Sequence, residues 1–139
     1  MRFMMFMIPA IYQGGNDAKL GESFAPDPEM MARMMEFNKE LADSGALISL
    51  DGLHPRSKGA RVSFKTGTPA VTDGPYVETK EVVGGYWIIN VASKADAIGV
   101  ACRCPAQEGD VIEIRQIFEM SDFPPEAQAK YIRSLHPGA

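Results

Sequence analysis

The sequence predicts an α+β domain in which two helices cover one face of an antiparallel sheet. Three observations lead to this class. The 139 residues suit one domain, amphipathic helical segments alternate with short strand-like runs, and the central elements follow the order βαββαβ. Apolar residues make up 45% of the chain and charged residues 23%, as in ordinary globular proteins. We therefore expect a core that needs neither disulfides nor metal.

The N-terminal half begins with a predicted strand at residues 2–8, apolar on both faces and ended by Pro9. This run is better explained as a strand than as the core of a signal peptide, because it is at the lower limit of length for one. Residues 12–27 are rich in glycine and polar residues and predict a surface loop. A helix follows, with Asp27 as N-cap, Pro28 at its first position and Gly45 as its stop. Its apolar face is expected to hold Met30, Met34, Phe37 and Leu41.

The middle of the chain predicts three strands, at 46–53, 60–66 and 85–91. In the second of these, Val62 and Phe64 alternate with polar residues, which is typical of a half-buried strand. The residues between the second and third strands are rich in turn formers.

The C-terminal half predicts a helix with Ser93 as N-cap and Asp96 three residues later, and Pro105 prevents its continuation. A strand is expected within 110–120 and a last short helix at about 125–134. The apolar face of the first helix is expected to hold Ile98, Ala101 and Cys102.

Without the last helix, and with the three middle strands counted loosely as two, the element order is βαββαβ, that of the ferredoxin-like fold. A sheet with one face in water should alternate apolar and polar residues, but the runs at 3–8 and 86–91 are apolar on both sides. The second face is therefore expected to be covered, and the sheet of a second copy is the economical cover. We predict a homodimer with two sheets face to face. Trp87, Ile89 and Val91 would point to one side of the sheet and Tyr86, Ile88 and Asn90 to the other.

Charge and cysteine spacing exclude several classes of protein. The net charge of −4 argues against nucleic-acid binding, which needs a basic stripe. No segment approaches the ~20 apolar residues of a membrane span. Cys102 and Cys104 are too close for an ordinary disulfide, and no second pair completes a zinc site. We expect free thiols, no metal and a cytoplasmic protein.

Common catalytic and cofactor motifs are also absent from the sequence. It has no phosphate-cradling glycine loop, no nucleophile elbow and no H-x-x-x-H pair. We therefore expect no cofactor.

The candidate catalytic residues are Asp73 and His54. Asp73 precedes Gly74-Pro75 and is either a turn former, accepting backbone N–H bonds, or a general base at a cavity mouth. His54 is either a turn residue or an acid–base group, and His136 is the only other histidine.

The candidate ligand contacts are charged and aromatic side chains. In an extended segment Glu78 and Lys80 share one face, either as an edge ion pair or in a pocket. Glu113 and Arg115 also share one side of a strand, where they form an exposed network or line a polar cavity with Arg61 or Asn90. Tyr86 is either core or a stacking surface for a flat ligand. Gly84 and Gly85 are expected to allow a bulge or a close backbone approach.

The segment "TDGPYVETKEVVGGYWII" at 72–89 resembles the signature of the YCII-related, or DGPF-domain, proteins. That signature reads roughly D-G-P-F-x-E-T-K-E-x-x-G-G-[FY]-x-[LI]-[IL], and Tyr76 replaces its usual Phe. "GLHP" at 52–55, "RCP" at 103–105 and "IEIR" at 112–115 have counterparts in order. The resemblance defines a domain at 1–120, followed by a C-terminal helical extension at 121–139.

The resemblance implies a dimeric α+β barrel built from ferredoxin-like subunits. Some proteins of the family lie beside, or are fused to, alternative sigma factors, and the broader fold includes isomerases and monooxygenases that need no cofactor. In one branch a His–Asp pair has been suggested as catalytic. The signature demands no histidine at His54, so this departure puts a His–Asp mechanism in doubt.

The function predicted from sequence is a small homodimer that binds a small polar organic molecule or transforms it by cofactor-free acid–base chemistry. Asp73 and His54 would exchange protons and Arg115 would orient an anion. Two alternatives remain: a regulatory or sensor module linked to transcription through a sigma factor, and a structural dimer without a ligand.

Overall fold

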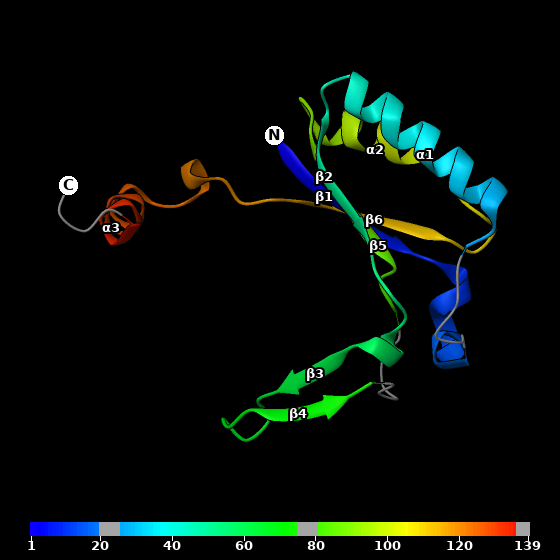
Figure 1. Cartoon of the computed structure of the whole chain (residues 1–139). Helices are drawn as coiled ribbons and strands as arrows, with labels where there is room; N and C mark the ends of the chain where they lie inside the picture. The colour runs from blue at the N-terminus through cyan, green and yellow to red at the C-terminus, as the bar shows by residue number, and fades with distance from the viewer. Residues whose placement is uncertain (20–25, 75–80, 136–139) are drawn as a thin grey trace.

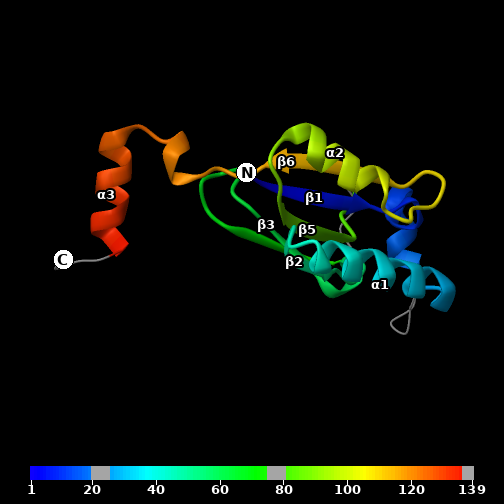
Figure 2. The same ribbon diagram turned by 90° about the horizontal axis from the view of Figure 1, so that it is seen from above.

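The computed structural model describes residues 1–19, 26–74 and 81–135, and its centre is a four-stranded antiparallel sheet in the order β2-β5-β1-β6. Two helices cover one face of this sheet (Figures 1 and 2). The predicted α+β, ferredoxin-like arrangement is confirmed. The elements are β1 (Arg2–Ile8), α1 (Pro28–Asp43), β2 (Leu47–Gly52), β5 (Gly85–Asn90), α2 (Lys94–Cys102) and β6 (Val111–Gln116).

The helix ends follow the local signals in the sequence. The Asp27 carboxylate accepts a hydrogen bond from the Met30 N–H at 3.4 Å, and Gly45 takes a φ of 81° just after α1 ends. The Ser93 hydroxyl accepts a hydrogen bond from the Asp96 N–H at 3.1 Å and caps α2. Both predicted N-caps are confirmed.

The predicted apolar face of α2 is partly wrong. Ala97 and Val100 are the buried residues of this helix, whereas Ile98 and Cys102 are exposed. Helical spacing alone did not indicate which of the several apolar residues of α2 faces the sheet.

The core lies between the two helices and the sheet. Phe3 and Met5 of β1 stand opposite Ile89 and Trp87 of β5, and all four are buried. The Trp87 indole N–H donates to Asn38 Oδ1 of α1 at 2.8 Å, so its polar atom is satisfied inside the core.

The opposite face of the sheet is open in the isolated chain. Met4, Phe6, Tyr86 and Ile88 lie there and are half-buried. The predicted division of β5 into two faces is confirmed, and the open face is apolar across its two central strands.

Between β2 and β5 the chain forms a separate hairpin, here called the arm (residues 60–73), made of β3 (Ala60–Ser63) and β4 (Ala70–Asp73). The arm lies on the side of the sheet away from α1 and α2 (Figure 1). Val62 and Phe64 were expected to be half-buried, and this is wrong: both are more than half exposed. Alternation predicts an apolar face, but it does not say which surface covers that face.

The surface loop predicted from residue 12 onward is also wrong for residues 12–19. They belong to the 3-10 helix η1 (Ala10–Lys19), and Tyr12 is buried. The glycine-rich composition did not indicate this element, because η1 is held in place by hydrogen bonds to segments far along the chain.

The predicted C-terminal helix is confirmed as α3 (Pro125–Leu135) and follows the short helix η3 (Met120–Asp122). It lies beyond the end of the sheet where the N-terminus is found (Figures 1 and 2).

Candidate functional site

Segments that carried the sequence signature meet where the arm leaves the sheet. The Leu53 N–H donates to the Gly84 carbonyl at 2.9 Å, and the Gly84 N–H donates to the Met7 carbonyl at 2.8 Å. On the arm, the Gly74 N–H donates to the Gly59 carbonyl at 2.8 Å. The "GLHP" and "GG" motifs and the Asp73-Gly74 pair therefore lie in one region.

Gly74 and Gly84 both permit close approach of backbone. A Cβ atom on Gly74 would overlap the carbonyl oxygen of Arg56, and one on Gly84 would lie 2.6 Å from Pro9 Cγ. The expected close approach at Gly84 is confirmed.

The helix η1 holds two walls of this region. The Tyr12 hydroxyl donates to the Leu53 carbonyl at 3.1 Å. The Gln13 amide donates to the Val82 carbonyl and accepts from the Val82 N–H, both at 2.9 Å. Because Gln13 bonds both backbone groups of Val82, this wall is fixed by a side chain outside the signature.

The walls enclose a cleft of about 410 Å³, here called the arm cleft. Its ionisable lining comes from His54 and from Arg56 and Lys58 of the short helix η2 (Arg56–Lys58) on one side, and from Glu81 on the other. The cleft is lined by Leu53, His54, Pro55, Arg56, Lys58, Gly59, Glu81, Val82 and Val83.

The arm cleft combines cationic groups with two groups able to transfer protons. Arg56 is only 8% exposed, which is unusual for arginine, whereas His54, Lys58 and Glu81 are exposed. Arginine and lysine favour an anionic ligand. Histidine and glutamate are the residue types used for general acid–base chemistry.

Arg56 and Lys58 were missed by the sequence reasoning, because basic residues in a turn are normally solvated. The available signal was their place in "HPRSK", directly after a family landmark.

Of the two predicted catalytic residues, one lines the arm cleft and the other lies near it. His54 lines the arm cleft. Asp73 ends β4 opposite Ala60 and is exposed, but it is not among the lining residues. The turn predicted for Asp73 continues into Pro75, which lies outside the described residues, so its role as a turn former stays a prediction. Glu78 and Lys80 lie outside the described residues.

The other predicted ligand contacts lie elsewhere. Glu113 and Arg115 are exposed on the open face, opposite Phe6 and Met4. Arg61 lies on the arm, in the separate two-stranded sheet, so the structure does not place it beside Arg115.

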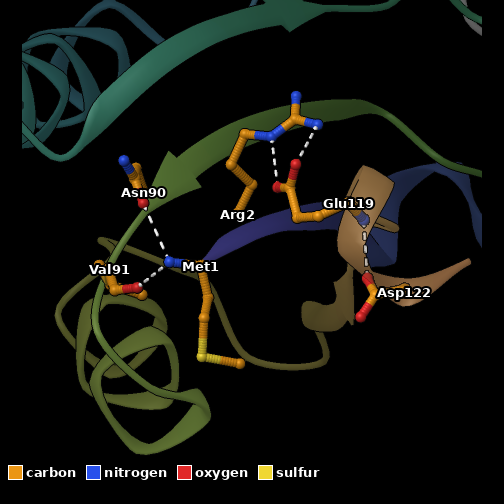
Figure 3. Close-up of polar contacts among 6 residues, drawn as sticks. All are labelled: Met1, Arg2, Asn90, Val91, Glu119 and Asp122. Carbon is orange, nitrogen blue, oxygen red and sulfur yellow. Dashed lines mark hydrogen bonds and ion pairs between the residues drawn. The ribbon is translucent and has the colours of Figure 1, made fainter. Parts of the chain in front are cut away.

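Tyr86 also lies on the open face, where its hydroxyl donates to Asp51 Oδ2 at 2.7 Å. That hydrogen bond raises the pKa of Tyr86, with smaller contributions from burial and from the Asp51 charge. Asn90 accepts a hydrogen bond from the N-terminal ammonium group at 3.1 Å (Figure 3).

A second cleft, of about 380 Å³, lies beside the N-terminal end of α1 and is rich in methionine. Its two carboxylates already serve the fold. Asp27 caps α1, and Asp110 accepts hydrogen bonds from the Ala10 and Gln107 N–H groups, both at 2.8 Å. The arm cleft is therefore the stronger candidate for a polar ligand.

The two cysteines are free and differ in environment. Cys102 is exposed and Cys104 is buried. Burial, and secondarily the Asp110 charge, raises the pKa of the Cys104 thiol to about 11. Among the residues that the structure describes, no group of three or more His, Cys, Asp or Glu side chains is placed to hold a metal ion.

Comparison with known proteins identifies the family. The model of the YCII-related domain matches residues 2–121, and the chain belongs to this family. An uncharacterized protein of Rhizobium meliloti (strain 1021) is 29% identical over 75 residues, which cover 54% of this chain and 60% of that relative. Within the described ranges, no helix is long and apolar enough to cross a membrane.

Proposed function

We propose that this chain is a homodimeric protein that binds a small anionic organic molecule in the arm cleft. The observation that carries the proposal is the convergence of His54, Arg56, Lys58 and Glu81, from two separate segments, on one cleft. Its volume of about 410 Å³ lies within the usual range for small-molecule sites. A carboxylate is the ligand group best matched to the exposed Lys58 ammonium group.

The enzymatic form of this proposal is cofactor-free acid–base chemistry. His54 and Glu81 would exchange protons with a ligand whose anionic group is held by Lys58. Asp73, at the neighbouring end of β4, would act as a further base if ligand binding draws the arm toward the cleft.

The dimer in this proposal forms through the open face of the sheet. Support comes from the half-buried apolar strip of Met4, Phe6, Tyr86 and Ile88, which a second identical face would cover. Two free thiols are consistent with a reducing cytoplasm. The association with a sigma factor rests on the family resemblance and stays a prediction.

A ligand-shift thermal screen against small carboxylates tests the proposed site. A ligand at about 100 times its Kd adds about 2.7 kcal/mol and should raise Tm by on the order of 10 °C. Lys58→Gln removes one charged contact and should weaken binding by about 10- to 100-fold.

The matched control is Lys94→Gln, an exposed lysine at the start of α2 and away from the cleft. It should retain the full shift in Tm. A screen without stabilising compounds, or a shift that Lys58→Gln retains in full, would contradict the proposal.

A further inference from the structure

The C-terminal helix α3 has an apolar face that its own chain leaves uncovered. Tyr131, Ile132 and Leu135 lie at helical spacing and are each more than half exposed. Its principal contact within its own chain is η3. Helices shorter than ~12 residues are marginal in water without packing, so α3 needs a covering surface.

The arm also has an apolar face that its own chain leaves uncovered. Val62 and Val71 stand opposite each other on one face, Phe64 extends that face, and all three are more than half exposed. An isolated two-stranded hairpin is marginal in water. The chain thus carries two apolar elements, each of which requires a partner.

The path of the chain toward α3 is fixed at the edge of the sheet. The Arg2 guanidinium donates to both carboxylate oxygens of Glu119, at 2.7 and 3.1 Å (Figure 3). The Glu119 N–H donates to Asp122 Oδ2 at 2.7 Å, and the Gln128 amide donates to the Phe123 carbonyl at 2.7 Å. The first of these bonds ties the start of the extension to β1, and the others are local bonds within η3 and between Phe123 and the first turns of α3.

The two elements leave the sheet from opposite ends. The chain leaves β6 at Gln116, which pairs with Phe3 at the start of β1. The arm joins at Gly52 and Gly85, which pair with each other at the far end of the strands. If two sheets pack face to face about a two-fold axis perpendicular to the strands, these ends are exchanged. The α3 of each copy then approaches the arm of the other copy, so the dimer has two such contacts.

The exposed area supports an extensive contact of this kind. The accessible surface of the chain is 9826 Å², whereas a compact monomer of 15.2 kDa exposes about 7100 Å². The chain thus exposes more surface than a compact monomer of its mass, as expected of a chain with protruding elements, and each subunit of a large obligate dimer hides ~1000–2500 Å².

We infer that the two subunits of the dimer exchange their C-terminal helices, the apolar face of each α3 packing on the Val62–Phe64–Val71 face of the partner's arm. This inference rests on the proposed dimer and deepens it. The exchange would also hold the arm, whose base adjoins the η2 wall of the arm cleft, through the second subunit.

Cross-linking in mixed dimers tests the contact. One chain carries Val62→Cys and a differently tagged chain carries Ile132→Cys, both with Cys102→Ser to remove the exposed thiol. After subunit exchange, a short bismaleimide should give a cross-linked band that contains one chain of each tag. The control replaces Val62→Cys by Ile98→Cys on α2, which should give no such band.

A substitution in the full chain tests the same contact without cysteines. Ile132→Asp should raise amide hydrogen exchange in the arm about tenfold or more, while Lys130→Asp on another side of α3 should leave it unchanged.

The outcomes separate this inference from the proposed dimer. If light scattering shows that the wild-type protein is a monomer, both the proposed dimer and the exchange of helices are overturned. If it is a dimer but the mixed band is absent, or if Ile132→Cys chains cross-link mainly to each other, only the exchange of helices is overturned.

Discussion

At the scale of residues, the arm cleft depends on side chains that lie in different parts of the chain. Gln13 holds both backbone groups of Val82, and Gly84 lies against Pro9 and Tyr12. Substitutions here should affect the cleft without touching its charged lining.

Gly84→Ala should destabilise the fold by about 1–3 kcal/mol, because the added methyl would lie 2.6 Å from Pro9 Cγ and 3.3 Å from Tyr12 Cε2. Gly52→Ala is the matched control, since a methyl group added at Gly52 would have nothing within 4 Å. Urea unfolding followed by Trp87 fluorescence measures both. Equal stability of the two variants would show that the contact at Gly84 is relaxed in solution.

The two thiols should differ sharply in reactivity. With its pKa raised to about 11 by burial and by Asp110, Cys104 holds roughly 0.1% thiolate at pH 8. A disulfide reagent should therefore modify a single cysteine in the native protein, and Cys102→Ser should abolish that rapid reaction. Two rapidly reacting thiols in the folded wild type would refute the burial of Cys104.

The residue scale also shows what the sequence could indicate about the site. His54 was a candidate because few other histidines exist, and it does line the cleft. Arg56 was not selected, because its place after a family landmark did not indicate its burial, which depends on contacts between η1 and η2.

At the scale of elements, features with local causes were predictable. The starts of α1 and α2 follow from N-cap side chains, each of which accepts a hydrogen bond from the N–H group three residues later. The predictions for the arm and η1 were wrong because the burial of their side chains depends on residues far along the chain. An alternating pattern identified the apolar face of β3, but its exposure in a single chain depends on what lies opposite.

The anchor of the C-terminal extension should depend on pH. The hydrogen bond from Arg2, followed by its charge, lowers the pKa of Glu119 below its ordinary value of 4.5. A lowered pKa in the folded state means that the stabilisation is complete above the unfolded pKa. It is lost as the pH falls through the folded pKa.

Carboxyl NMR titration tests this anchor. The Glu119 midpoint should lie below 4.5 in the wild type and rise in Arg2→Met, whereas Arg33→Met on α1 should leave it unchanged. An unshifted wild-type midpoint would mean that the ion pair does not persist in solution.

At the scale of the whole molecule, a single chain leaves three apolar surfaces uncovered. Its helices cover one face of the sheet, while the other face, the arm and α3 all expose apolar side chains. One dimer with two-fold symmetry would cover all three surfaces. The family resemblance and the apolar pattern of β1 and β5 both led to this expectation, whereas the contact proposed between the arm and α3 was suggested only by their positions in the structure.

Light scattering of the wild type and of Ile88→Glu tests the dimer most directly. Ile88 lies at the centre of the open face, so a buried carboxylate there should separate the subunits. Ile98→Glu, on the exposed side of α2, is the control. The wild type and Ile98→Glu should have twice the 15.2 kDa mass of the chain, and Ile88→Glu should have that mass once. A monomeric wild type, or an Ile88→Glu variant that remains a dimer, would contradict the account.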